Sequence, residues 1–223
     1  MSRILATHMP VRDPDFPNAK VFDHPLIRHK LTRMRDRRTP PAEFRQLLNE
    51  IAGLMTYEVC RDLETVETEV ETPVAITRGH RLRDQVTLVP VLRAGIGMCD
   101  GILSLFPEAR VGHIGIYRDE ATATPVEYYR KLPRDVASGP VFIVDPMLAT
   151  GGSAAKAVAD LRSLGCKHVQ MICLVAAPEG IRRMQAADDQ LVVNVAAIDD
   201  RLNERKFIVP GLGDAGDRIF GTA

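Results

Sequence analysis

The groups best suited to chemistry in this chain lie in the run Asp145-Pro146-Met147-Leu148-Ala149-Thr150-Gly151-Gly152-Ser153. Thr150 and Ser153 carry hydroxyl groups that can donate hydrogen bonds to an anion. Gly151 and Gly152 lack Cβ, so a ligand can approach their backbone closely. Asp145 can accept hydrogen bonds from the hydroxyl groups of a sugar. The run therefore has the chemistry of a site for a phosphorylated sugar.

The segments on either side place this run at the start of a helix. Residues 141–144 are apolar, rich in β-branched residues and too short for a helix, which indicates a buried strand of a parallel sheet. Residues 154–164 have helical apolar spacing, and Gly165 follows where a left-handed residue commonly ends a helix. Unpaired backbone N–H groups and the helix dipole favour phosphate at such a helix start. The run is neither a Walker A nor a G-x-G-x-x-G motif.

The Thr-Gly-Gly-Ser turn, considered alone, has a structural interpretation that is about as good as the functional one. Gly151 and Gly152 would then only make a tight connection between strand and helix, and Ser153 would only cap the helix. The nine residues together are far more specific than the turn.

Composition and charge argue against several classes of protein. Lys and Arg total 29, as do Asp and Glu, so the formal net charge is zero, and the basic stripe typical of nucleic-acid-binding domains is missing from the sequence. The 4 cysteines form no C-x-x-C pair, and the 6 histidines form no H-E-x-x-H motif. We therefore expect buried thiols in a reducing compartment and no structural zinc site.

Hydropathy argues against a membrane protein. No apolar run approaches the ~20 residues that span a bilayer, and residues 1–16 lack the apolar segment of a signal peptide. We expect a soluble cytoplasmic protein with neither a nucleic-acid nor a membrane partner.

Helical and strand-like segments alternate along the chain, which predicts an α/β fold with a mainly parallel sheet flanked by helices. The length of 223 residues fits one domain. The predicted helices are at residues 24–36, 39–60, 97–107, 154–164 and 178–187, the strands are at 86–92, 111–117, 141–144, 168–176 and 191–197, and a projecting β arm is at 65–85.

Several segments carry further expectations. Thr39 is predicted to cap the second helix with its hydroxyl, and the basic residues of 24–36 fit a solvated face. Residues 1–20 are expected to be weakly ordered, and the poorly patterned residues 121–133 to form a mobile flap. The arm at 65–85 is a candidate contact with a partner subunit.

Three functional side chains follow predicted strands directly. These are Arg93, Arg118 and Asp145, and parallel sheets bind ligands beyond the carboxyl ends of their strands. Each arginine taken singly also fits an ordinary surface charge. Arginine is nonetheless the residue suited to a pyrophosphate, because it offers a planar fork of donors and a permanent charge.

The C-terminal residues 207–222 form an unusual stretch. Their glycines and Pro210 argue against a helix or a regular strand, while apolar residues such as Ile219 favour burial. We expect an ordered, glycine-shaped loop on the core, whose backbone donors and acceptors can pair with the edge of a flat heterocycle.

These motifs together resemble the uracil phosphoribosyltransferase family, in one order over nearly the whole chain from about residue 20. The nine-residue run resembles the 5-phosphoribosyl-1-diphosphate (PRPP) signature of that family. The other matching stretches are residues 24–26, 30–31, 34–35, 91–95, 117–120, 174–180 and 208–222, of which Gly211-Leu212-Gly213-Asp214-Ala215-Gly216-Asp217 is the most specific.

The resemblance implies a phosphoribosyltransferase (Rossmann-like) fold in a single domain, with residues 199–223 as a small uracil-binding hood over the active site. It implies transfer of the 5-phosphoribosyl group from PRPP to N1 of uracil, giving UMP and diphosphate in pyrimidine salvage, with Mg²⁺ as cofactor. It also implies a homo-oligomer, a dimer or a tetramer, and GTP is a candidate effector because some relatives are activated by it.

The same resemblance assigns roles to individual residues. Arg93 and Arg118 would contact the diphosphate, and Asp145 the ribose hydroxyls. Asp214 would lie near the ribose or hold Mg²⁺ indirectly through PRPP, and it joins Arg118 and Asp145 as a catalytic residue. The residues implied for the 5-phosphate are Met147, Leu148, Ala149, Thr150, Gly151, Gly152 and Ser153, and Pro146 is implied to bind PRPP as well. Those implied for uracil are Ile208, Gly213, Asp214 and Ala215.

Two positions depart from the family pattern. Pro146 stands where most phosphoribosyltransferases have a second acid, which is usual for the uracil enzymes but puts a direct metal role of this loop in doubt. Phe207 stands where the family often has tyrosine. The base that takes the proton from uracil N1 is either Asp214 or the metal-bound diphosphate. The rival functions are a PRPP- or nucleotide-binding regulator without turnover, and a phosphoribosyltransferase for another base.

Overall fold

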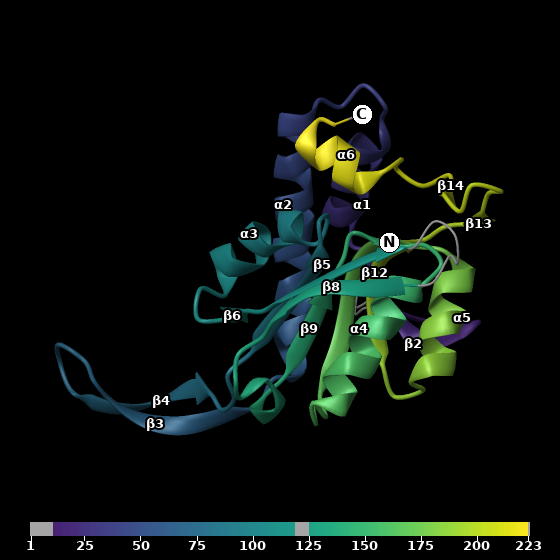
Figure 1. Cartoon of the computed structure of the whole chain (residues 1–223). Coiled ribbons are helices and arrows are strands. Elements are labelled where there is room, and N and C mark those ends of the chain that lie inside the picture. Colours follow the sequence, from purple (N-terminus) through teal and green to yellow (C-terminus); the bar gives the residue numbers. More distant parts are fainter. Residues whose placement is uncertain (1–10, 119–124, 223) are drawn as a thin grey trace.

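The computed structural model describes residues 11–118 and 125–222, and its centre is a ten-stranded sheet (Figure 1). The main path of the sheet runs β1-β2-β12-β11-β9-β5-β7-β8, with β10 beside β11 and β6 beside β5. The strands are β1 (Val11–Asp13), β2 (Phe16–Val21), β5 (Thr87–Leu92), β6 (Arg110–Val111), β7 (His113–Arg118), β8 (Pro125–Lys131), β9 (Val141–Val144), β10 (Met147–Leu148), β11 (Val169–Ala176) and β12 (Val192–Ile198).

The inner strands are parallel and the two edges are antiparallel. Strands β2, β12, β11, β9, β5 and β7 pair in parallel, whereas β1 pairs with β2 and β8 with β7 in the antiparallel sense. The predicted α/β fold class with a mainly parallel sheet is therefore confirmed.

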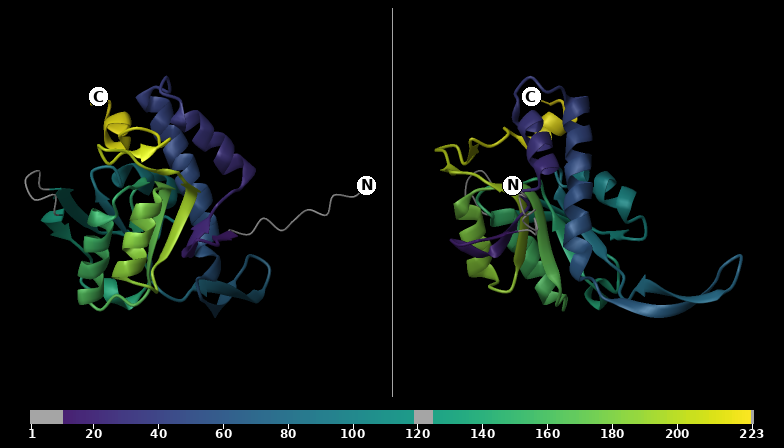
Figure 2. Two further views of the ribbon diagram at one scale, coloured as in Figure 1. Left: turned by 90° about the vertical axis from the view of Figure 1, so that its right-hand side faces the viewer. Right: turned by 180° about the vertical axis from the view of Figure 1, so that it is seen from behind.

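Helices cover both faces of the sheet, as the views in Figure 2 show. The helices are α1 (Pro25–Arg35), α2 (Pro41–Val59), α3 (Ile96–Leu105), α4 (Gly152–Ser163), α5 (Pro178–Ala187) and α6 (Ala215–Phe220), with short 3₁₀ turns η1 (Cys60–Asp62) and η2 (Val136–Ser138). Phe142 and Val144 pack into the cluster that contains α1, α2 and α3, while Val141 and Ile143 pack into the one that contains α4 and α5. Burial on both faces explains why β9 is a continuous apolar run.

Two small sheets extend from this body. Strands β3 (Thr65–Glu71) and β4 (Ile76–Leu82) form an antiparallel hairpin that projects well beyond the core in Figures 1 and 2. This hairpin is the predicted β arm. Strands β13 (Arg201–Leu202) and β14 (Ile208–Val209) form the second small sheet, which precedes the C-terminal helix α6.

Four expectations need correction. Residues 11–13 and 16–21, expected to be weakly ordered, form β1 and β2, because β2 pairs with β12 at the edge of the sheet; residues 1–10 lie outside the described part. Residues 125–131 of the expected flap form β8, which pairs along β7, and residues 119–124 lie outside the described part.

The other two corrections concern helix ends. The hydroxyl of Thr39 donates to Arg33 O instead of capping α2, whose N-cap position is Pro40. The C-terminal stretch, expected to lack helix, contains α6, because Asp214 caps it and Arg45 donates to Ile219 O near its end. Within the described residues, no helix combines the length and apolar character needed to cross a bilayer.

Candidate active site

The turn after β5 brings Arg93 to the carboxyl end of β9. A methyl group on Gly95 would lie only 2.3 Å from the carbonyl oxygen of Val144, so this turn is pressed against the end of the neighbouring strand. Only glycine permits that approach. The side chain of Arg93 is exposed, and its Nη2 lies 3.9 Å from the point that a methyl group on Gly216 would occupy. Arg93 thus lies beside the start of α6.

The loop between β9 and α4 is held by a close contact with α5. Gly151 has φ +71°, and a methyl group there would lie 2.9 Å from the carbonyl oxygen of Gly180. A methyl group on Gly180 would in turn lie 2.5 Å from the carbonyl oxygen of Ala149. The helix begins at Gly152, and Ser153 makes no capping hydrogen bond. The interpretation of Ser153 as the helix cap is therefore wrong, and its hydroxyl is not committed to that role.

The C-terminal hood is built on left-handed glycines. Gly211 has φ +61° and Gly213 has φ +81°, conformations that glycine adopts without the steric penalty of a side chain. Asp214 Oδ1 accepts a hydrogen bond from Asp217 N at 3.0 Å and so caps α6. This hydrogen bond holds the side chain of Asp214 in one orientation.

Basic side chains from α1, α2 and α6 hold the hood in place. Arg35 binds both carboxylate oxygens of Asp199 at 2.7 Å and also donates to Gly211 O. Arg218 donates to Leu212 O at 2.8 Å and lies over the ring of Phe44. Sequence reasoning missed these residues, because basic residues near a helix end most often face solvent and each partner is remote in the chain.

A pocket of about 350 Å³ joins the two glycine-shaped loops. The predicted site residues that line it are Asp145, Met147, Ala149, Thr150, Ile208, Gly213, Asp214 and Ala215. It is also lined by Ala94, Arg205, Lys206, Phe207 and Gly216, which the sequence did not indicate as site residues.

The remaining predicted residues lie at different distances from this pocket. Pro146 and Leu148 are buried behind the loop, whereas Gly151, Gly152 and Ser153 continue from Thr150 into α4. Arg93 is not among the described residues that line the pocket. Arg118 is the last residue of β7, and its side chain lies outside the described part of the structure.

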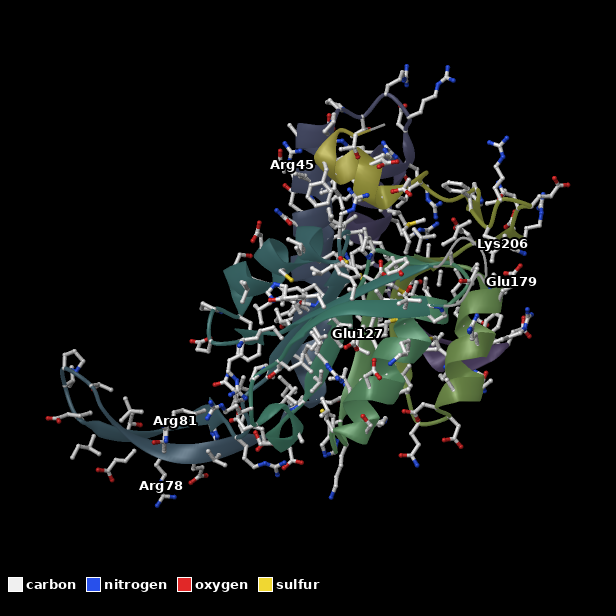
Figure 3. The ribbon with its side chains drawn as sticks, viewed as in Figure 1. Arg45, Arg78, Arg81, Glu127, Glu179 and Lys206 are labelled. Carbon is white, nitrogen blue, oxygen red and sulfur yellow. The ribbon has the colours of Figure 1, made fainter. Side chains whose placement is uncertain are left out.

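Lys206 is the additional lining residue with an unusual backbone. Its φ is +66°, a value rare for residues other than glycine. Hydrogen bonds stabilise the turn around it, because Asn203 Oδ1 accepts from the backbone N–H groups of Arg205 and Phe207. Figure 3 shows Lys206 and Glu179 at the hood side of the molecule, far from the arm that carries Arg78 and Arg81. A sequence pattern gives no sign of this conformation.

The pKa of the Asp145 carboxyl is raised to about 7, mainly because burial disfavours the charged form; a hydrogen bond from Met147 N lowers it, and the negative charge of Asp214 adds a smaller increase. Asp145 and Asp214 are therefore near enough to influence each other across the pocket. A carboxyl that titrates near neutrality in a cleft is a typical feature of a functional site.

These two acids also bear on metal binding. Within residues 11–118 and 125–222, no three His, Cys, Asp or Glu side chains come together as a metal site. One or two carboxylates suit Mg²⁺ that is held mainly by substrate phosphates and water. The pocket therefore fits an ion that arrives with a phosphorylated substrate rather than one held by the protein alone.

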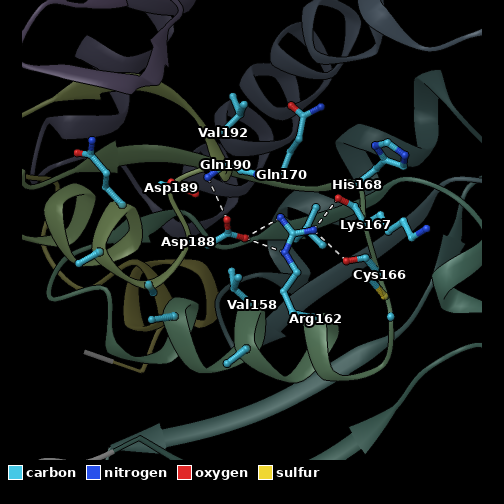
Figure 4. Close-up of a pocket in the computed structure, with 17 residues that line it drawn as sticks. Val158, Arg162, Cys166, Lys167, His168, Gln170, Asp188, Asp189, Gln190 and Val192 are labelled. Carbon is cyan, nitrogen blue, oxygen red and sulfur yellow. Dashed lines mark hydrogen bonds and ion pairs between the residues drawn. The ribbon is translucent and has the colours of Figure 1, made fainter.

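A larger hollow of about 1200 Å³ lies at the other end of the parallel strands, beside the amino ends of β11 and β12 (Figure 4). Its most prominent cation, Arg162, is fully engaged: it pairs with Asp188 and donates to the carbonyl oxygens of Cys166 and Lys167. These contacts join the ends of α4 and α5 and leave no free charge on Arg162 for a ligand. The pocket between the glycine-shaped loops is the better candidate.

Comparison with solved structures defines the class of protein. The AQ2163 protein from Aquifex aeolicus is 36% identical with a TM-score of 0.86, covering 92% of this chain and 99% of that one. A hypoxanthine-guanine phosphoribosyltransferase from Bacillus anthracis, 12% identical with a TM-score of 0.50 over 71% of this chain and 80% of its own, shares the fold. The fold is that of the phosphoribosyltransferases, as expected.

Sequence comparison is more specific. A family model described as uracil phosphoribosyltransferase matches residues 21–222. Uracil phosphoribosyltransferases from Lysinibacillus sphaericus and Symbiobacterium thermophilum are 54% and 55% identical over 203 residues, or 91% of this chain and 97% of each relative. The chain belongs to the uracil phosphoribosyltransferase family, which confirms the resemblance noted in its motifs.

Proposed function

We propose that this protein transfers the 5-phosphoribosyl group of PRPP to N1 of uracil, giving UMP and diphosphate. The observation that carries the proposal is the single pocket that joins Thr150 of one glycine-shaped loop to Gly213 of the other. A transfer between a sugar phosphate and a flat base requires both to be held in contact, and only adjacent sites can do that.

The start of α4 supplies the proposed site for the 5-phosphate. Its first backbone N–H groups have no partner within the helix and carry the positive end of the helix dipole. Gly152 leaves the backbone accessible, and the hydroxyls of Thr150 and Ser153 add donors. Asp145, at the end of β9, then lies where it can accept hydrogen bonds from the ribose hydroxyls.

The hood supplies the proposed site for uracil. Ile208 and Ala215 are buried, whereas Gly213 is exposed and lines the pocket. A uracil edge alternates acceptors and donors, and backbone amides and carbonyls in a fixed loop can match that pattern. Because this recognition uses backbone groups, the presence of Phe207 where the family often has tyrosine is expected to change uracil binding little.

The leaving group is the place where charge develops. As the bond to diphosphate breaks, C1 of the ribose gains oxocarbenium character, and positive charge near the diphosphate lowers the barrier. Arg93 and Arg118 are the proposed protein contacts for the diphosphate. Mg²⁺ bound with PRPP would neutralise part of the same charge, and Asp214 is the carboxylate that would hold it, indirectly through PRPP.

Uracil N1 must lose a proton during the transfer. Asp214 is exposed and lines the base side of the pocket, so its carboxylate is one candidate acceptor. The departing diphosphate is the other. None of the described residues that line this pocket is a histidine, the usual base at neutral pH.

A base-specificity assay tests the proposal. Protein, PRPP and Mg²⁺ are incubated with uracil, orotate, hypoxanthine or adenine, and nucleotide products are separated by chromatography. We expect UMP to form with uracil and rates at least about a hundredfold lower with the other bases, because a polar site left unpaired rejects the wrong ligand strongly. PRPP binding without any nucleotide would favour the regulator instead, and a faster reaction with another base would overturn the choice of uracil.

Oligomeric state and regulation remain predictions. Val74 in the turn of the β3–β4 arm and Ile76 at the start of β4 are 94% and 65% exposed, which supports the arm as a contact with a second copy of the chain. Light scattering should then give a dimer or tetramer, and a monomer would contradict the prediction. GTP remains a candidate effector, and UMP formation with and without GTP tests it.

A further inference from the structure

Arg183 on α5 lies against the loop that begins α4. The Cβ of Arg183 lies 3.3 Å from the point that a methyl group on Gly151 would occupy. The guanidinium reaches further along the loop, with Nη1 3.6 Å and Cζ 3.7 Å from the corresponding point on Gly152. Thr150 Oγ1 lies 3.7 Å from that same point. A hydroxyl and a guanidinium therefore flank one position at the start of α4.

This guanidinium is placed beside positive rather than negative charge. The N-terminus of α4 carries the positive end of the helix dipole, which repels a cation. Among the described residues, Arg183 has no hydrogen-bond or ion-pair partner, and its side chain is exposed. An unpaired cation at a helix start is unfavourable in the free protein, and an anion between the two would remove the repulsion.

The acid best placed to neutralise Arg183 is engaged elsewhere. Glu179 lies four residues earlier on α5, the spacing of a helical ion pair. Its Oε1 accepts a hydrogen bond from Leu202 N at 3.1 Å, and this bond is the main reason that the pKa of Glu179 is lowered, with smaller effects from the charges of Arg182 and Lys206. Glu179 therefore anchors β13 and leaves Arg183 without a counter-charge.

We propose that Arg183 binds the 5-phosphate of the sugar substrate, adding a charged, forked donor to the backbone N–H groups of α4. The inference rests on the proposed function, since it assigns a residue to the phosphate end of PRPP. Arginine suits this task because its donors match the oxygens of a phosphate in a bidentate manner. The loop glycines let the phosphate approach the backbone closely, and Arg183 supplies a positive charge that residues 145–153 lack.

The chain offers a matched control in the next residue. Arg182 has the same charge and is also exposed, but its guanidinium lies over the ring of Phe16, 5.3 Å from the centroid. We compare R183A, R183K and R182A with the unmodified protein. The measurements are the KM for PRPP, the KM for uracil, kcat, the inhibition by ribose 5-phosphate and the inhibition by diphosphate.

The expected pattern separates the phosphate end from the rest of the site. R183A should raise the KM for PRPP and weaken the inhibition by ribose 5-phosphate, each by roughly 5- to 30-fold. This lies in the lower part of the range for losing a charged hydrogen bond, because the site is exposed. The KM for uracil, kcat at saturating PRPP and inhibition by diphosphate should change less than about twofold. R183K should be intermediate, and R182A should match the unmodified protein.

Equal PRPP and ribose 5-phosphate constants for R183A and R182A would overturn the inference. A loss of diphosphate affinity as large as that of ribose 5-phosphate would also overturn it, since it would indicate a general charge effect. If the unmodified protein forms no UMP, the proposed function fails, and calorimetry of ribose 5-phosphate binding to R183A and R182A still decides the role of Arg183. Thermal melting of each variant confirms that it is folded.

Discussion

Arg35 and Asp199, separated by 164 residues in the chain, form a bidentate ion pair with two nitrogen–oxygen distances of 2.7 Å. The pair also binds both backbone polar groups of Gly211: Arg35 donates to its carbonyl oxygen at 2.7 Å, and Asp199 accepts from its N–H at 2.8 Å. Gly211 begins the loop that leads to Gly213 and Asp214. The conformation of the hood is therefore fixed by a contact outside the pocket.

Removing Arg35 should loosen this loop. The side chain of Asp199 is only 5% exposed, so R35Q would leave a buried carboxylate without its counter-charge, at a cost of about 3 kcal/mol in the free energy of unfolding. We expect a higher KM for uracil with a smaller change in the KM for PRPP. Denaturant unfolding and steady-state kinetics measure both effects.

Arg33 provides the control for R35Q. It lies on the same helix and pairs with Glu43 at the surface, where both side chains are more than a third exposed, so R33Q should change the free energy of unfolding by less than about 0.5 kcal/mol. Equal effects of R33Q and R35Q on stability and uracil binding would contradict the role assigned to the Arg35–Asp199 pair.

The contact between Gly151 and α5 should make substitution there costly. G151A forces a left-handed conformation and a 2.9 Å approach to Gly180 O, whereas G165A has a similar φ, +87°, but its nearest neighbour is Ala137 Cβ at 3.8 Å. The left-handed conformation alone costs about 1–2 kcal/mol, which is the whole expected cost of G165A. G151A should lose more stability and should weaken PRPP binding. Scanning calorimetry measures the stability of both variants, and titration calorimetry measures their affinity for PRPP. Equal PRPP affinities of G151A and G165A would show that the loop geometry is unimportant.

The raised pKa of Asp145 has a consequence for stability. The unfolded carboxyl titrates near its ordinary value of 3.8 and the folded one near 7, so the folded state binds more protons between these values. Stability of the ligand-free protein should therefore fall as the pH rises from about 4 to 7, and then level off with respect to this group. D145N should remove this component and be more stable than the unmodified protein at pH 8, by about 1–3 kcal/mol.

Urea unfolding of both proteins across pH 4 to 8 measures the difference. Subtracting the D145N curve removes the contributions of all other groups that titrate alike in the two proteins. A difference that does not change with pH would show that Asp145 is ionised throughout, with an ordinary pKa.

The charge of Asp214 can be tested without removing the helix cap. Asparagine is as good an N-cap as aspartate, so D214N should keep the hydrogen bond from Asp217 N and the fold of α6. Turnover should fall at least about a hundredfold if the carboxylate acts in the transition state, with little change in PRPP affinity. D217N is the control, because it removes the same charge from α6 at a residue whose carboxylate accepts a hydrogen bond from Thr222. Turnover of D214N within a few-fold of D217N would remove Asp214 from the catalytic residues.

Local patterns were sufficient to predict most of the fold and both loops. Residues 141–144 are a continuous apolar run because β9 is buried on both faces, and the predicted loop follows it directly. The glycines of both loops are visible in the sequence because their conformations exclude other residues. The sequence therefore indicated two loops that the structure brings to one pocket.

What local patterns could not supply depends on remote partners. Strand β2 forms because it pairs with β12, which is remote in the sequence. Helix α6 has only six residues, one of them a glycine, so the sequence pattern does not indicate a helix there; Asp214 caps it in the structure. Arg35 looked like a solvated charge because Asp199 is far along the chain. The backbone of Lys206 has a positive φ, which residues other than glycine rarely adopt, so no sequence pattern indicates it as a pocket residue.

The measurement that tests the central claim most directly is a single-turnover reaction with labelled uracil. Protein in excess over uracil is mixed with PRPP and Mg²⁺, quenched at intervals, and analysed for UMP and diphosphate. If the phosphate loop and the hood hold both substrates in one pocket, UMP and diphosphate should appear in equal amounts and at equal rates, with little free ribose 5-phosphate. Diphosphate released without UMP, or PRPP that binds and stays intact beside bound uracil, would contradict it.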